Sequence, residues 1–163
     1  MVVSRYLVNR EKIMLENLVF GSPIEGTPPS PDHIRAVLHD YCKCLSEGDV
    51  DGILNLFDPE AHFFDPVGEP PRIGHDQIRE FFEPSAGQLV LRPEGAIRVA
   101  GFYAAVGMRA RVHGYGPEFF VDTLDAVVFN EAGKMTHFYA FWGSSNNPSP
   151  DTNWPPHQGW DNT

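Results

Sequence analysis

Three polar side chains occupy positions where the surrounding sequence is apolar: Tyr41, Asp65 and Asp125. A phenol can donate a hydrogen bond to a developing negative charge, and a carboxyl group can take up or release a proton. Burial in an apolar pocket would push the pKa values of two carboxyls apart, so that one acts as a base and the other as an acid. Taken together, the three side chains indicate proton transfer on an apolar ligand.

Each of the three also has a simpler structural explanation. Asp125 shares a predicted strand face with Val121 and Val127, but the opposite register would place it in solvent. Asp65 precedes Pro66, where an aspartate is often only a turn residue. Tyr41 on a helix face can simply fill the core with its hydroxyl at the rim. No single residue carries the functional interpretation, which depends on all three converging.

Helices are predicted in the first half of the domain. Ser30-Pro31-Asp32 is a good helix start, and Gly48 ends the apolar periodicity that follows. Asp49 can cap a second helix, which we expect to include Phe57, and a third helix is expected to follow Gly74.

Strands are predicted between and after these helices. A short strand is expected over 61–65, and the long alternating stretch 102–113 is followed by aromatic-rich strands over 119–129 and 135–142. Residues 130–133 read Asn-Glu-Ala-Gly, a hairpin turn signal. The order predicts an α+β fold in which a curved antiparallel sheet wraps around helices and encloses an apolar pocket.

The domain is expected over residues 31–147. Residues 1–30 form an extension in which an amphipathic stretch over 1–20 precedes a Pro/Gly-rich linker, and 148–163 form an irregular tail. The extension and the tail could cover the pocket, contact a partner subunit or make no contact with the domain.

Composition excludes several classes of function. The net charge of −10 argues against a nucleic-acid groove, and no apolar run is long enough to span a membrane. Charges interrupt the N-terminal stretch, and Cys42 and Cys44 on a helix cannot bridge each other, so we expect a cytoplasmic protein.

Other catalytic motifs are weak. His62 and Asp65 could contribute to a metal site, but no paired-cysteine or HExxH spacing supports one, and we expect no metal. Ser144-Ser145 lacks the context of a nucleophile elbow, and no glycine-rich phosphate loop follows a strand, so we expect no cofactor.

Several motifs resemble the bacterial Δ5-3-ketosteroid isomerases of the NTF2-like, SnoaL-like superfamily. They include Gly48-Asp49-Val50-Asp51-Gly52, Phe64-Asp65-Pro66-Val67-Gly68 and Leu124-Asp125 with Ala132-Gly133-Lys134 downstream, within a match over about residues 33–146. The resemblance implies a general base at Asp65, with Tyr41 and a protonated Asp125 as oxyanion-hole donors. This separation of pKa values is known from the family and is therefore implied here, not predicted independently.

The resemblance also implies a reaction and a substrate. Asp65 would move a proton so that an isolated double bond comes into conjugation with a ketone through a dienolate, on a small apolar, steroid-like ketone. The substrate-binding positions would be Phe57, Phe82, Met108, Phe138 and Trp142. Phe82 and Phe57 replace tyrosines that support the oxyanion-hole tyrosine in the family, so we expect a tuned or weakened hole. A homodimer is expected by the same resemblance.

Two alternatives stay open at this point. One is a SnoaL-like epoxide hydrolase or cyclase that tailors polyketides or terpenoids with the same cone and two acids. The other is a non-catalytic NTF2-like binding module, which would not need an acid on an apolar strand face.

Overall fold

A computed structural model describes residues 24–114 and 119–143 of the chain. Its helices are α2 (Pro31–Glu47), α3 (Val50–Leu56) and α4 (Gly74–Phe82). Its strands are β1 (Phe57–Phe64), β2 (Arg72–Ile73), β3 (Leu89–Ala100), β4 (Tyr103–Val112), β5 (Phe120–Phe129) and β6 (Met135–Phe141). The amphipathic stretch predicted over 1–20 and the tail 148–163 lie outside the described residues.

The helix α2 begins and ends where the sequence predicts. The side chain of Ser30 accepts a hydrogen bond from the backbone N–H of His33 at 3.2 Å, which caps the first turn. Gly48 adopts a φ of 80°, a left-handed conformation that glycine tolerates best, and this ends the helix. The apolar periodicity buries one face of α2, and that face carries Tyr41.

The second helix is shorter than predicted, and the prediction that it includes Phe57 is wrong. The helix α3 ends at Leu56, and Phe57 has extended backbone angles as the first residue of β1. Pro59 explains the difference, because the residue before a proline is disfavoured in the helical region. The strand β1 therefore begins four residues earlier than the predicted strand over 61–65.

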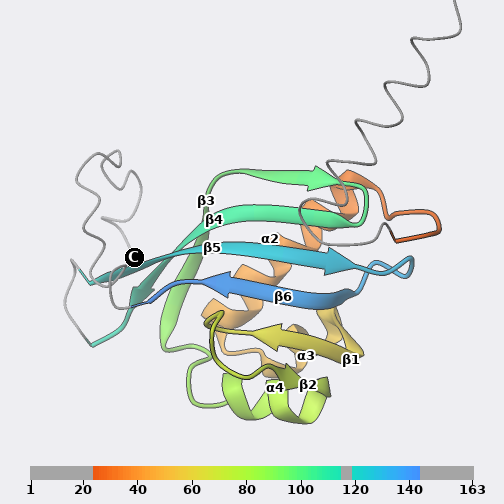
Figure 1. Ribbon diagram of the computed structural model, residues 1–163. Coiled ribbons are helices and arrows are strands. Elements are labelled where there is room, and N and C mark those ends of the chain that lie inside the picture. The colour runs from red at the N-terminus through yellow and green to blue at the C-terminus, as the bar shows by residue number, and fades with distance from the viewer. Residues whose placement is uncertain (1–23, 115–118, 144–163) are drawn as a thin grey trace, which may run out of the picture.

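The six strands form one curved, open sheet in the order β2-β1-β6-β5-β4-β3. All neighbouring strands are antiparallel except β1 and β6, which are parallel. Figure 1 shows α2 lying across one face of the sheet, with α3 and α4 at the end formed by β1 and β2. The α+β class and the cone-like arrangement predicted from the sequence are confirmed.

The strand β3 was not predicted from the sequence. It spans 12 residues and pairs with β4 along most of its length. Pro93 and Gly95 lie inside it, and both residue types are depleted in strands, which hides the alternation of its side chains. The pairing register shifts between Glu94 and Arg98, so the strand bends where the sequence pattern fails.

One large apolar core joins the helices to the concave face of the sheet. On the other face, Leu124 and Phe141 pair across β5 and β6 and are 52% and 48% exposed.

The homodimer stays a prediction, as does the cytoplasmic location. No helix among residues 24–114 and 119–143 is long and apolar enough to cross a membrane.

Candidate active site

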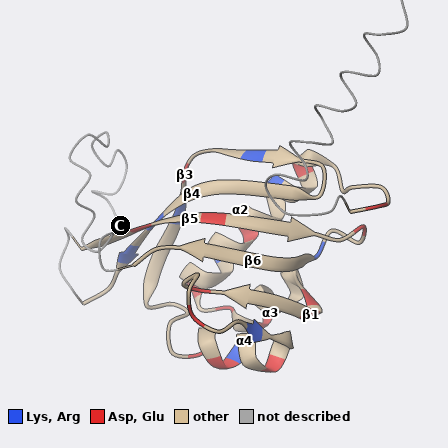
Figure 2. Ribbon diagram, viewed as in Figure 1, with Lys and Arg blue, Asp and Glu red and all other residues tan. Residues whose placement is uncertain are grey.

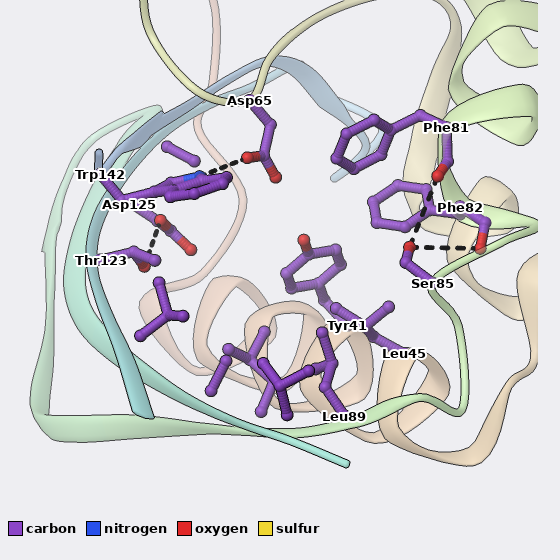
Figure 3. A pocket seen from close by; sticks show the side chains of 15 residues that line it. Tyr41, Leu45, Asp65, Phe81, Phe82, Ser85, Leu89, Thr123, Asp125 and Trp142 are labelled. Atoms are coloured by element: carbon purple, nitrogen blue, oxygen red, sulfur yellow. Dashed lines mark hydrogen bonds between the residues drawn. The ribbon is translucent and has the colours of Figure 1, made fainter. Parts of the chain in front are cut away.

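A cavity of about 310 Å³ lies between α2, α4 and the concave side of the sheet. This volume falls at the lower end of the range that small-molecule sites occupy. Its walls are mainly aliphatic and aromatic, and Figure 3 shows the lining side chains. They are Tyr41, Leu45, Asp65, Phe81, Phe82, Ser85, Leu89, Leu91, Ala110, Val112, Val121, Thr123, Asp125, Ala140 and Trp142.

Asp125 reaches the cavity from the middle of β5. It is 3% exposed and lies on the strand face of Val121 and Val127, as the alternation predicted. Thr123 Oγ1 donates a hydrogen bond to Asp125 Oδ1 at 2.8 Å, and Oδ2 has no hydrogen-bond partner within the described part of the chain. Burial raises the pKa of Asp125 to about 8, against the opposing effect of the Thr123 hydrogen bond and with a further contribution from the charge of Asp65. The side chain is therefore a neutral acid at pH 7.

Tyr41 approaches from α2, with its hydroxyl directed into the cavity (Figure 3). Its ring is held by Phe57, Phe82 and Phe138, at centroid distances of 6.4, 6.1 and 5.0 Å. The hydroxyl makes no hydrogen bond to any residue of 24–114 or 119–143. Burial, reinforced by the charges of Asp65 and Asp125, raises the pKa of Tyr41 well above its ordinary value. The phenol therefore stays protonated and remains a donor for a ligand.

Asp65 follows the last residue of β1 and faces the other two groups across the cavity (Figure 3). Trp142 Nε1 donates a hydrogen bond to Asp65 Oδ1 at 2.6 Å. Burial raises the pKa of Asp65, while the Trp142 hydrogen bond and the positive charge of Arg72 both lower it. Asp65 thus has two stabilising partners for its ionised form, whereas Asp125 has one hydroxyl.

Arg72 positions the backbone at Asp65. Its Nη1 donates to the carbonyl oxygen of Asp65 at 3.0 Å, and its guanidinium lies 4.3 Å from the centroid of the Phe81 ring. The short strand β2 places Arg72 next to Phe63 on β1, so the pairing of these two strands brings the arginine to Asp65.

The structure brings Tyr41, Asp65, Asp125, Phe82 and Trp142 to one cavity, but not the other three predicted positions. Phe57 and Phe138 lie behind Tyr41 and pack against its ring without lining the cavity. The sulfur of Met108 lies 3.6 Å from Cys42 Sγ, and Met108 does not line the cavity either. These three side chains contribute to the wall that supports the cavity, because each is buried in the core beside it.

Sequence reasoning missed Thr123 and Arg72 as parts of the site. Thr123 lies two residues before Asp125 on β5 and so shares its strand face, a signal available from the alternation alone. Arg72 had no comparable signal, because its approach to Asp65 depends on the pairing of β2 with β1.

Within the part of the chain that the structure describes, no group of three or more His, Cys, Asp and Glu side chains is arranged to hold a metal ion. His62 and His137 lie side by side on β1 and β6, but their rings stack at 5.1 Å on the sheet and do not join Asp65. In the cavity, an ionisable carboxylate faces a neutral acid and a phenol across an apolar space, and these three groups are suited to acid–base chemistry.

Comparison with known proteins finds enzymes among the similar sequences. The chain is 28% identical over 109 residues to the steroid Δ-isomerase of Nocardioides simplex, a match that covers 67% of this chain and 89% of that protein. It is 36% identical over 75 residues to the epoxide hydrolase LasB of Streptomyces lasalocidi, covering 45% of this chain and 26% of LasB.

A solved structure of a similar enzyme also matches the chain. The epoxide hydrolase/cyclase-like enzyme SalBIII, described as having a role in pyran ring formation in polyether salinomycin, matches with a TM-score of 0.64 and 25% identity. That match covers 71% of this chain and 95% of SalBIII. The family model of the SnoaL-like domain matches residues 38–141, which includes all the residues of the cavity except Trp142. The chain therefore belongs to the SnoaL-like domain family.

Proposed function

We propose that this protein is an isomerase of the ketosteroid type, which moves an isolated double bond into conjugation with a ketone. One observation carries the proposal. The Tyr41 hydroxyl and Asp125 Oδ2 are buried, face one apolar cavity and have no hydrogen-bond partner among the described residues. Buried polar groups of this kind nearly always have a partner, so a ligand oxygen is the natural one.

The reaction follows from the positions of the three groups. Asp65, as carboxylate, takes a proton from the carbon between the ketone and the double bond. The electron pair of that C–H bond moves into the conjugated system, and negative charge collects on the ketone oxygen, giving a dienolate. Tyr41 and neutral Asp125 donate hydrogen bonds to this oxygen in a site where water does not compete. Asp65 then returns the proton two carbons further along, which yields the conjugated enone and restores the carboxylate.

The absorbance of the conjugated enone tests this function. Purified protein mixed with a 5-ene-3-ketosteroid is expected to produce growth of the enone band in the ultraviolet. Asp65→Asn should abolish this growth with ligand affinity roughly retained, and Asp125→Ala should lower kcat by more than about tenfold, because one oxyanion donor contributes roughly 10²–10³-fold. A flat trace with the unmodified protein contradicts the proposal.

The matches to LasB and SalBIII favour a second candidate, an epoxide hydrolase or cyclase. In that reaction Asp125 would donate a proton to the epoxide oxygen as a C–O bond breaks, while Asp65 accepts the proton of the attacking hydroxyl or water. Internal attack leaves the mass of the substrate unchanged, and hydrolysis adds one water. Mass spectrometry and chromatography of a hydroxy-epoxide incubated with the protein distinguish this candidate from the isomerase.

A further inference from the structure

A second cavity adjoins the catalytic one at α4. It has a volume of about 760 Å³ and is lined by Arg72, Gln77, Glu80, Phe81, Pro84 and Ser85. Phe81 and Ser85 also line the catalytic cavity, so these two side chains border both spaces. A ligand that occupied both cavities would have to pass these two side chains.

The two cavities differ in chemistry. The inner one is apolar apart from the acid–base groups and two hydroxyls, and none of its lining residues is a lysine or arginine. The outer one has a guanidinium, an amide and a carboxylate among its six side chains. Figure 2 shows both basic and acidic positions on α4, and the strand β2, whose first residue is Arg72, contacts this helix. Arg72 is thus the single cation that lines either of these two cavities.

The guanidinium of Arg72 is held in place but not saturated. Its Nη1 donates to the carbonyl oxygen of Asp65, and its central carbon lies over the ring of Phe81. No other hydrogen bond or ion pair joins Arg72 to the described residues. A guanidinium has five N–H donors in a fixed fork, which matches the two oxygens of a carboxylate. The half-buried Arg72 therefore has N–H donors left for a ligand in the outer cavity, which it lines.

We propose that the outer cavity binds a carboxylate at the end of the substrate opposite its ketone, with Arg72 as the partner of that carboxylate. The natural substrate is then an apolar ring ketone that is also a carboxylic acid. This inference rests on the proposed function for one point, the placement of the ketone at Tyr41 and Asp125. The formal net charge of −10 repels anions in general, so a preference for the acid must come from this local cation.

Replacing Glu80 should change the affinity for a carboxylate in the opposite direction to replacing Arg72. It lines the same outer cavity as Arg72 and is exposed, and the two side chains do not form a salt bridge with each other. If a carboxylate occupies this cavity, loss of the negative charge at Glu80 strengthens binding and loss of the positive charge at Arg72 weakens it. Arg79 supplies the control, because it lies on α4, pairs with Asp51 at 2.6 Å and lines neither of the two cavities.

The experiment compares two ligands that cannot be isomerised: a saturated polycyclic ketone with a carboxylate at the far end, and the methyl ester of the same compound. Calorimetry on the full chain gives the Kd of each, and the ratio of the two cancels changes that affect the inner cavity alone. We expect the acid to bind about tenfold more tightly than the ester, as one charge-assisted hydrogen-bonded pair would give. Arg72→Gln should abolish this preference, Glu80→Gln should increase it, and Arg79→Gln should leave it unchanged.

The outcomes separate this inference from the proposed function. Three results would overturn the inference, even if the 5-ene-3-ketosteroid is isomerised. They are that the acid and the ester bind equally, that neither binds, or that Arg72→Gln and Arg79→Gln have an equal effect. A preference for the acid that depends on Arg72 supports the inference even if no enone forms, in which case the isomerase function alone fails.

Discussion

Thr123 Oγ1 and Asp125 Oδ1 are joined by a 2.8 Å hydrogen bond on the cavity side of β5. The bond occupies one oxygen of the acid, and the other oxygen has no hydrogen-bond partner among the described residues. On the opposite side of the site, Tyr41 is surrounded by phenylalanine rings and has no polar support among the described residues. Among the described residues, hydrogen-bond support in this cavity is therefore concentrated on the acid, not on the phenol.

Replacing Thr123 should change how the activity depends on pH. The Thr123 hydrogen bond lowers the pKa of Asp125, so Thr123→Val should raise that pKa further above about 8. The proposed isomerisation needs neutral Asp125, so the alkaline limb of the kcat/KM profile should move to higher pH. Thr123→Ser keeps the hydroxyl and should retain the original limb. If the alkaline limbs of Thr123→Val and Thr123→Ser coincide, the Thr123 hydroxyl has no influence on the pKa of Asp125.

Replacing Trp142 should move the opposite limb. Trp142 donates to Asp65 at 2.6 Å and lowers the pKa of that carboxyl. Trp142→Phe keeps an aromatic wall but removes the donor, so the pKa of Asp65 should rise and the acid limb of kcat/KM should shift to higher pH. The alkaline limb should stay in place. Steady-state rates measured across the acid range check this, and an unmoved acid limb would show that the indole does not tune the base.

Removing the hydroxyl of Tyr41 should affect the rate far more than the fold. The ring remains among Phe57, Phe82 and Phe138 in Tyr41→Phe, and the deleted hydroxyl has no partner within the described residues. Loss of one oxyanion donor should lower kcat by roughly 10²–10³-fold. Thermal unfolding should show a Tm close to that of the unmodified protein. If kcat falls only as far as the loss of stability explains, Tyr41 takes no part in the chemical step.

Burial of Asp125 should make the free energy of unfolding depend on pH. The pKa of Asp125 is about 8 in the folded protein and close to the ordinary value of about 4 in the unfolded chain. Between these values the folded state holds one more proton than the unfolded state, so stability falls as pH rises from about 4 to about 8. Asp125→Asn should remove this slope, on the order of a few kcal/mol in total.

Denaturant unfolding of both proteins at pH 5 and pH 8 measures the slope. Other titrating groups are common to the two proteins and cancel in the difference. A difference in stability that is the same at both pH values would mean that Asp125 titrates near its ordinary value and is not a neutral acid at pH 7.

Local sequence determined much of the scaffold. The cap at Ser30 and the stop at Gly48 define α2 because both act through neighbouring backbone groups. The alternation in residues 119–129 placed Asp125 on the buried face of β5, since the period of a strand is fixed by its geometry. These features depend only on residues close in the chain, so the sequence carries them directly.

Tertiary structure decided which side chains meet. The strand β3 and the parallel pairing of β1 with β6 depend on partners far apart in the sequence, and their local signals are weak. Phe57, Met108 and Phe138 are as apolar as Phe82, yet only Phe82 lines the cavity, because the packing of α2 and α4 against the sheet sets the cavity boundary.

The environment of each candidate catalytic group was also decided by the tertiary structure. The sequence supplied Tyr41, Asp65 and Asp125 as candidates from their types and positions. Only the fold places Trp142 against Asp65 and Thr123 against Asp125 within one apolar space. Desolvation and hydrogen bonding set the pKa of a carboxyl, and both depend on neighbours that distant parts of the chain bring together.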